Sequence, residues 1–430
     1  MNMKTTFSIP AVAAQVLLAS SLLLSGPVAG QDRGQIAGAV LLPMGEADFA
    51  PDTLVRIDAG RAQLPGVSLE PVSFTYPLPA EADIDGPGAP FETRSREYWT
   101  EVGGDELRAG VVLHVSSPRA LVRLNPAGSA QVAGLGETHA ISPETLVLTV
   151  DGESHAGGTG MELLVDAGQL RAAGAPFVDG TSAFRIRGDL GVGPLTLSAP
   201  ELRAVGERFV IHVFEPESEL SLDLVAGRAD YFHGDTLTVT ADLGGLALRR
   251  VEGYVISPAG RAWPVVFERA AEGRYVARLQ LDALEAPGQG LWEVHMAASA
   301  QRDDLTVIRN GRAAFACHLP TAGLTGEASV QRRRDGSLGA TFGVSAASGG
   351  RYEVRGLLYG TDGAGKLRPM AIGHAAAWFE DEGRLTLDFD GGLIKASGLS
   401  APFEIRDLRL LDQGRMGQLH RQGRALVIDR

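Results

Sequence analysis

Residues 236–243 read Thr-Leu-Thr-Val-Thr-Ala-Asp-Leu, so apolar and polar side chains alternate along the whole stretch. The leucine, valine and alanine residues share one face, and the threonines and Asp242 share the other. A period of two is typical of a β-strand that is buried on one side only. Similar runs recur through residues 218–319, which are therefore predicted to form an immunoglobulin-like β-sandwich of about seven strands without a cysteine pair.

Shorter alternating runs extend outward from this segment in both directions. Residues 31–217 are predicted to form an N-terminal β-rich module, in which residues 31–93 are poorly defined because proline, glycine and aspartate interrupt them. Residues 320–430 are predicted to form a C-terminal β-sandwich that begins with a linker at 320–326. Tight turns are expected there at 335–336, 361–365 and 390–392. The expected fold class is all-β, with tandem β-sandwich modules.

The first 30 residues have the pattern of a secretory signal peptide. Lys4 gives a positively charged start, residues 11–24 are mostly apolar, and small residues lead up to Gly30, after which cleavage is expected. The apolar run is shorter than the about 20 residues that cross a bilayer core, which disfavours the alternative of a retained membrane anchor. The only cysteine is Cys317, so the apolar run is not followed by a lipid-anchor site. The chain is predicted to be exported, into the periplasm or out of the cell.

The charge balance disfavours some classes of binding partner. The chain carries 39 basic and 52 acidic residues, a formal net charge of −13, which disfavours nucleic acid and anionic membranes. One cysteine allows no intramolecular disulfide, and Cys317 lies in an apolar run, where a small buried side chain is favoured over a reactive thiol. The 55 glycines and 23 prolines divide the chain into short segments, which favours strands over long helices.

Several longer motifs resemble an uncharacterised family of exported bacterial proteins. The motifs are Ser95-Arg96-Glu97-Tyr98-Trp99, residues 110–115 and 120–126, residues 209–216, Tyr231-Phe232-His233-Gly234-Asp235, residues 356–362 and residues 410–416. The resemblance covers most of the chain from residue 95 and implies an N-terminal module, a bacterial immunoglobulin-like middle and a C-terminal β-sandwich. That family is a domain of unknown function without assigned catalytic residues. Some of its members resemble type II secretion substrates, and calcium binding is suggested among them.

Signatures of known enzymes are absent from the sequence. It contains no Gly-x-Ser-x-Gly, no His-Glu-x-x-His and no phosphate-binding loop, and its nine histidines are scattered. Trp292 alternates with Val294 and Met296, which predicts a place in the core. A sugar-binding platform made of Tyr98 and the tryptophans is the alternative.

Calcium is the one cofactor that the sequence suggests. Its preferred ligands are carboxylate and carbonyl oxygens, and two Asp-x-Asp-Gly stretches begin like an EF-hand loop. Neither is an EF-hand, because the glutamate expected at the twelfth position is missing from both. Aspartates beside glycines are also ordinary turn residues. The candidate calcium ligands are Asp83, Asp85, Asp362, Asp388 and Asp390.

Together these features predict an exported, multi-domain β-sandwich protein without evident enzymatic machinery. We expect a binding, adhesion-like or structural accessory protein, with a periplasmic or extracellular protein or glycan as partner and the secretion machinery as a partner during export. The alternative is a secreted hydrolase or hydrolase-accessory protein whose site is assembled from dispersed residues of the N-terminal module.

Overall fold

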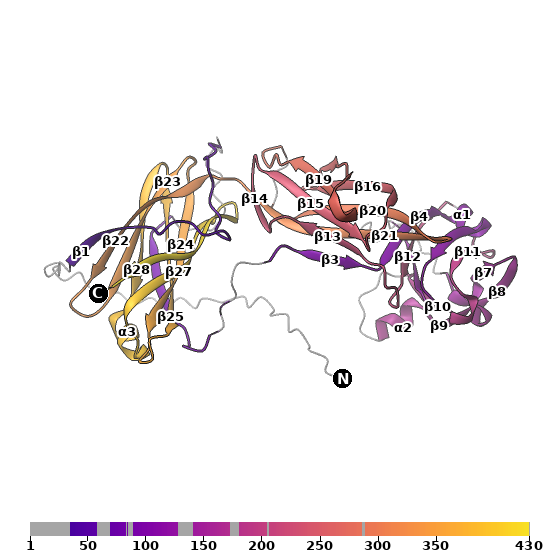
Figure 1. Cartoon of the computed structure of the whole chain (residues 1–430), viewed down its shortest axis with the longest axis horizontal. Coiled ribbons are helices and arrows are strands. Elements are labelled where there is room, and N and C mark those ends of the chain that lie inside the picture. Colours follow the sequence, from indigo (N-terminus) through magenta and orange to yellow (C-terminus); the bar gives the residue numbers. More distant parts are fainter. Residues whose placement is uncertain are drawn as a thin grey trace.

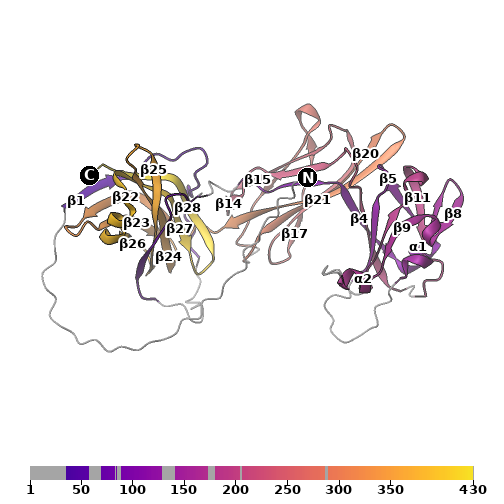
Figure 2. The same cartoon turned by 90° about the horizontal axis from the view of Figure 1, so that it is seen from below.

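Three β-sandwiches lie in a row in the computed structural model, which describes residues 35–57, 69–82, 84, 89–127, 141–172, 180–203, 206–285 and 289–429. The C-terminal domain lies at one end, the central domain in the middle and the N-terminal domain at the other end (Figure 1, Figure 2). The predicted all-β fold class is confirmed. Within the described ranges, no helix is long and apolar enough to cross a membrane. The predicted signal peptide at residues 1–30 lies outside the described residues.

The N-terminal domain packs a five-stranded sheet, in the order β4-β12-β6-β10-β9, on a four-stranded sheet, in the order β5-β11-β7-β8. Alternate side chains of both sheets, such as Leu113, Phe184 and Phe209, are almost fully buried between them. The elements are β4 (Glu97–Gly103), α1 (Gly104–Ala109), β5 (Val111–Val115), β6 (Leu121–Pro126), η1 (Pro143–Thr145), β7 (Val147–Val150), β8 (Glu153–Ala156), η2 (Gly157–Thr159), β9 (Met161–Val165), α2 (Ala167–Ala172), β10 (Ser182–Ile186), η3 (Gly188–Leu190), β11 (Gly193–Ser198) and β12 (Arg208–Phe214).

The central domain is a sandwich of two five-stranded sheets, in the orders β18-β19-β15-β13-β3 and β14-β21-β20-β16-β17. The opening stretch, residues 236–243, forms β15 and buries its apolar face as predicted, and Trp292 is in the core. The elements are β3 (Glu92–Ser95), β13 (Leu222–Ala226), β14 (Asp230–Phe232), β15 (Thr236–Leu243), β16 (Leu248–Ile256), β17 (Ala262–Pro264), β18 (Glu268–Arg269), η4 (Ala271–Gly273), β19 (Tyr275–Gln280), β20 (Trp292–Arg302) and β21 (Leu305–His318).

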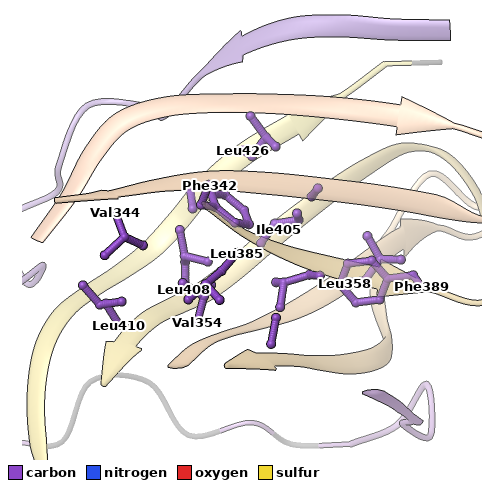
Figure 3. Close-up of a cluster of buried hydrophobic side chains, with 14 of the residues drawn as sticks. Phe342, Val344, Val354, Leu358, Leu385, Phe389, Ile405, Leu408, Leu410 and Leu426 are labelled. Carbon is purple, nitrogen blue, oxygen red and sulfur yellow. The ribbon is translucent and has the colours of Figure 1, made fainter. Parts of the chain in front are cut away.

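The C-terminal domain pairs a four-stranded sheet, in the order β1-β22-β23-β26, with a five-stranded sheet, in the order β2-β25-β24-β27-β28. Its core lies between the sheets, where Phe342 and Leu385 meet Val354 and Ile405 (Figure 3). The elements are β1 (Gln35–Val40), β2 (Val72–Pro77), β22 (Ala322–Arg332), β23 (Leu338–Ala346), β24 (Gly350–Thr361), β25 (Leu367–Phe379), β26 (Glu382–Phe389), α3 (Gly391–Ser397), β27 (Ser400–Asp412) and β28 (Gly417–Ile428).

Two strands of the C-terminal domain come from the beginning of the chain. β1 pairs antiparallel with β22, and the two lie side by side in Figure 1. β2 pairs antiparallel with β25 at the edge of the other sheet. Both strands fall in the part of the sequence that is poorly defined by pattern alone, because their partners lie far away in the chain. β1 and β2 therefore complete a domain that is otherwise built from the last part of the chain.

Two local expectations in the C-terminal domain are wrong. Residues 322–326 were expected in a linker but belong to β22, whose pairing with β23 shifts register between Leu324 and Ala328. Gly323 and Gly326 in this stretch produced the loop-like pattern. The turn expected at residues 390–392 begins α3 instead, because the Asp390 carboxylate accepts a hydrogen bond from the Leu393 amide at 2.9 Å and caps the helix.

The N-terminal and central domains are joined by a buried polar network. Arg309 of β21 is fully buried, and its Nη2 atom donates to the Glu215 Oε2 atom at 2.5 Å. The same nitrogen donates to the Ser116 and Ser218 hydroxyls at 3.1 and 2.8 Å. The Ser116 amide donates to Glu215 at 2.6 Å. Buried charges have to be paired and hydrogen-bonded, so this network fixes how the two domains meet.

The central and C-terminal domains meet at an aromatic contact supplied by the segment after β1. Phe49 stacks on Phe232 of the central domain, with ring centroids 4.1 Å apart. Phe49 and Arg421 of β28 exchange two backbone hydrogen bonds, of 2.9 and 2.7 Å. His318 lies beside both rings and its Nε2 atom is 2.8 Å from the Asp230 carboxylate. This junction therefore depends on a residue that belongs to the C-terminal domain but lies far in the sequence from β22–β28 and from the central domain.

Candidate ligand-binding face

The outer face of the sheet β2-β25-β24-β27-β28 carries an unusual set of side chains. Even-numbered residues of β24, such as Val354 and Leu358, point into the core, so Glu353 and Arg355 point outward. Cross-strand pairing places five residues in one row, one from each strand of this sheet. The row is Phe74, His374, Arg355, Arg409 and Arg421. We call these residues, with Arg406 and Arg424 beside them, the arginine face.

The β2 end of the arginine face is apolar and partly open to solvent. Phe74 is 43% exposed and Tyr76 is 59% exposed, and their rings meet edge to face with centroids 5.5 Å apart. Phe74 also stacks on the His374 imidazole at 4.8 Å. The His374 Nδ1 atom lies 2.7 Å from the Glu353 carboxylate, which fixes the ring against the sheet. An aromatic surface of this kind is suited to the apolar face of a ligand.

The other end of the arginine face is built from arginines that share carboxylates. Asp407 accepts hydrogen bonds from the Nε atoms of Arg409 and Arg421, at 2.9 and 2.8 Å. Glu404 likewise bridges Arg406 and Arg424, at 2.7 and 2.6 Å. Each acid neutralises only one of its two arginines. These pairs therefore hold the guanidinium groups in place while leaving an excess of positive charge.

The backbone conformation of Asp407 and the burial of its neighbours set the properties of this arginine–carboxylate cluster. Asp407 lies at a β-bulge in the pairing of β24 with β27 and has a φ of 45°, a backbone conformation that costs energy outside glycine and recurs at functional sites. Burial opposes ionisation of Asp407, but the hydrogen bonds from Arg409 and Arg421 outweigh it and hold its pKa below the ordinary value. Burial and, to a smaller extent, the charge of Arg409 lower the pKa of Arg355.

Arg355 is the open position in the arginine face. Among the residues that the structure describes, its guanidinium makes no hydrogen bond or ion pair, although Asp407 and Glu353 contribute favourable charge. It lies in the row between the His374 ring and the Arg409 guanidinium. A guanidinium presents a planar fork of donors that matches a carboxylate, sulfate or phosphate group. The arrangement can therefore bind an anionic group next to an apolar ring.

The predicted calcium ligands that are described each have protein partners. Asp362 closes the β24–β25 turn, where its carboxylate accepts hydrogen bonds from the Ala364 and Lys366 amides at 3.0 and 2.8 Å. Asp388 accepts a hydrogen bond from Arg333 at 2.8 Å, and Asp390 caps α3. The hydrogen bond from the Lys366 amide is the largest influence that lowers the pKa of Asp362.

Calcium at these residues stays a prediction. Asp83 and Asp85 lie outside the described residues. In the described ranges, no three histidine, cysteine, aspartate or glutamate side chains gather in a way that could hold a metal ion. Burial raises the pKa of the Cys317 thiol to about 12, which agrees with the predicted inert cysteine.

The alternative function, a hydrolase, was predicted to have its site in the N-terminal module. A shallow depression there is lined by Arg108, Pro200, Glu201, Leu202 and Arg203. The described part of its lining combines one carboxylate with two guanidinium groups and contains no serine, cysteine or histidine. Nucleophilic hydrolysis needs a nucleophile and a base within hydrogen-bond reach, and these residues do not supply that pair.

The residues of the arginine face were missed by sequence reasoning. Residues 320–430 were predicted to form a β-sandwich, and Arg355 and Arg409 occupy outward positions of its strands β24 and β27. A solvated face is the ordinary explanation for an arginine at such a position. Only the pairing of β2 with β25 and of β24 with β27 brings Phe74, His374 and the arginines together.

Comparison with known proteins gives a family and a fold. Three family models match consecutive parts of the chain: the N-terminal domain of a domain of unknown function, DUF4785, at residues 63–215, its central domain at 218–318 and its C-terminal domain at 321–429. Among curated proteins, no relative matches the chain.

Two solved structures illustrate the range of similarity. The crystal structure of a DUF4785 family protein from Legionella pneumophila subsp. pneumophila str. Philadelphia 1 matches with a TM-score of 0.70 and 18% identity, over 89% of this chain and 99% of that chain. This likeness shows the fold. A Salmonella alpha-2-macroglobulin mutant matches with a TM-score of only 0.16 and 11% identity, over 82% of this chain and 24% of that chain, and supports no argument.

Proposed function

The chain belongs to the DUF4785 family, which has no assigned activity, and we propose that it is an exported binding protein whose arginine face takes a carboxylated glycan. The observation that carries this proposal is the row of Phe74, His374, Arg355, Arg409 and Arg421 across one sheet. The row places an exposed aromatic ring beside a guanidinium without a partner among the described residues.

The charge of the row supports an anionic ligand. The chain has a formal net charge of −13, yet this surface carries more arginines than acids. Arg409 and Arg421 share one carboxylate, and Arg406 and Arg424 share another. An anion that binds here meets donors already held in place, which reduces the entropy lost on binding.

The apolar end of the row supports a sugar rather than a small inorganic anion. The C–H face of a sugar ring packs on an aromatic side chain, and Phe74 and Tyr76 are both exposed beside His374. A uronate residue combines such a face with one carboxylate.

Export is a separate part of the proposal. It depends on the charged start, apolar run and small-residue cleavage site of the first 30 residues. Fractionation of cells that express the full chain tests it: processed protein outside the cytoplasm is expected, and unprocessed protein in the cytoplasm would contradict it.

Binding is tested by calorimetry with oligogalacturonate at low ionic strength. The double variant Arg355→Gln, Arg409→Gln is expected to bind at least about tenfold more weakly, because each charge-assisted hydrogen bond contributes about 1.5–3 kcal/mol. Affinity should also fall as salt is added. The matched control is Arg250→Gln in the central domain, whose side chain is 78% exposed and pairs with Glu252. Equal affinity of the double variant and the wild type would remove the arginine face from the proposal.

A further inference from the structure

The first three positions of the arginine face have counterparts in the other two domains. In each domain, three neighbouring strands place an aromatic residue, a histidine and an arginine opposite one another on the outer face of a sheet. The three rows are Trp99, His212 and Arg123 in the N-terminal domain; Tyr254, His295 and Arg312 in the central domain; and Phe74, His374 and Arg355 in the C-terminal domain.

Each row also includes a glutamate that fixes its histidine. Glu97 lies 2.9 Å from His212, Glu293 lies 2.8 Å from His295, and Glu353 lies 2.7 Å from His374. All three histidine side chains are 16% exposed. The glutamates come from different strands of their sheets, on β4, β20 and β24. The same four groups are thus assembled in three different ways, with no matching sequence repeat.

The aromatic ring contacts its histidine in each row. Tyr254 stacks on His295 with centroids 5.0 Å apart, and Trp99 lies 6.5 Å from His212 in a tilted arrangement. Tyr254 is 41% exposed, and Arg312 is exposed. These groups are therefore accessible at the surface and are not core contacts.

The rows of the N-terminal and central domains approach each other at the junction. β3 and β4 run from one domain into the other: the Thr93 hydroxyl donates to the Arg312 carbonyl, and the Asn310 side chain donates to the Trp99 carbonyl at 3.3 Å. The hydrogen bond with His212 and, more weakly, the charges of Arg123 and Arg312 outweigh burial and hold the pKa of Glu97 below its ordinary value. Arg312 of one row therefore acts on Glu97 of the other.

We propose that these two rows form a second glycan-binding surface, the junction strip, which consists of Tyr254, His295, Arg312, Glu97, His212 and Trp99. It combines the aromatic rings of Tyr254 and Trp99 with the Glu97 carboxylate, the two imidazoles and the Arg312 guanidinium, which suit the ring faces, hydroxyl groups and carboxylates of a sugar chain. The inference rests on the proposed function and extends it. Because the arginine face and the junction strip lie on different domains, the ligand is a polymer that repeats its recognised unit and binds both surfaces.

Two binding surfaces on one molecule change how affinity depends on ligand length. A second contact becomes intramolecular once the first has formed, and such linkage raises overall affinity by about 10²–10⁴. Polygalacturonate should therefore bind much more tightly than a trimer, even at equal concentration of sugar units. A protein with a single surface gains far less from length.

The experiment compares four proteins by affinity electrophoresis in polygalacturonate. They are the wild type, the arginine-face variant Arg355→Gln, Arg409→Gln, the junction-strip variant Tyr254→Ala, Arg312→Gln, and the combination. Each double variant is expected to bind polygalacturonate at least about tenfold more weakly than the wild type, but still measurably. The combination should be retarded by polygalacturonate no more than the control Arg250→Gln is retarded by uncharged dextran. Arg312→Gln alone, which keeps the backbone contact with Thr93, provides a second strip variant if Tyr254→Ala fails to fold.

The outcomes separate this inference from the proposed function. If the arginine-face variant loses all binding and the strip variants bind like the wild type, the junction strip is wrong and the proposed function stands. If only the strip variants lose binding, the strip is right and the arginine face is wrong. Absence of binding by the wild type would overturn both.

Discussion

The two domain junctions of this molecule depend on different kinds of contact, one between buried charges and one between aromatic rings. The junction between the N-terminal and central domains is a buried ion pair, Arg309 with Glu215, in which the side chains are 1% and 0% exposed. The junction between the central and C-terminal domains is a stack of two rings, Phe49 on Phe232. A buried ion pair tolerates little displacement because an unpaired buried charge is costly, whereas an apolar contact tolerates sliding. The first junction should be rigid and the second more adaptable.

Removing one charge from the first junction is expected to have the largest effect. Glu215→Ala leaves the Arg309 guanidinium buried without its carboxylate, and the free energy of unfolding should fall by about 3–5 kcal/mol. The measurement is urea unfolding followed by a probe in the central domain. Glu217→Ala is the control, because Glu217 is 52% exposed and pairs with Arg119 at 3.6 Å. A loss below about 1 kcal/mol in Glu215→Ala would show that the ion pair does not hold this junction.

Removing the ring from the second junction should cost less. Phe49→Ala loses one aromatic stack and part of its apolar burial, and we expect the C-terminal domain to lose about 2 kcal/mol. Small-angle scattering should show a broader range of shapes, because the central domain loses its contact with the segment after β1. Phe91→Ala is the control, since Phe91 is 54% exposed. An unchanged scattering profile would contradict the role given to Phe49.

The predicted calcium ligands of the C-terminal domain can be tested independently of the two junctions. If Asp388 and Asp390 hold calcium with a dissociation constant of about 1 mM, 5 mM calcium should stabilise this domain by about 1 kcal/mol. Thermal unfolding with calcium chloride or a chelator measures this. The double variant Asp388→Asn, Asp390→Asn should lose the response. A response that persists in the variant, or its absence from the wild type, would contradict the predicted site.

Acid should weaken the N-terminal domain through Glu97, and this is the smallest effect expected. The Glu97 pKa is lowered in the folded protein from the ordinary value of 4.5, chiefly by the hydrogen bond with His212. Its stabilising contribution is therefore complete above pH 4.5 and is lost as pH falls through the lower folded value. The difference in stability between the wild type and Glu97→Gln should vanish in strong acid. A difference that grows as pH falls would have the wrong sign.

Sequence periodicity predicted what is local in this fold. Residues 236–243 form β15 as their alternation indicates, and Trp292 is buried as its neighbours imply. Pairing over long distances could not be predicted this way. β1 pairs with β22 and β2 with β25, and no local pattern specifies such partners. The arginine face was missed for the same reason, because it exists only after β2 has paired.

Buried charge was the second feature beyond sequence reasoning. Arg309 follows Val307 at the same parity of β21, so it occupies an inward position of a strand that is otherwise apolar there. Arginine at such a position contradicts the pattern unless a carboxylate meets it. Glu215 meets it from the other domain, and this partner is visible only in three dimensions.

The docking of β1 and β2 into the last domain determines the order in which the domains can fold during synthesis. β1 pairs with residues 327–332, so it leaves the ribosome long before its partner exists. At roughly 5–20 residues per second, the two early strands wait for tens of seconds while the first two sandwiches become available for folding. Phe74 belongs to one of these waiting strands, and the arginine face is complete only when that strand docks. A chain that is cut short anywhere before its last strands therefore lacks this face, however well its earlier domains have folded.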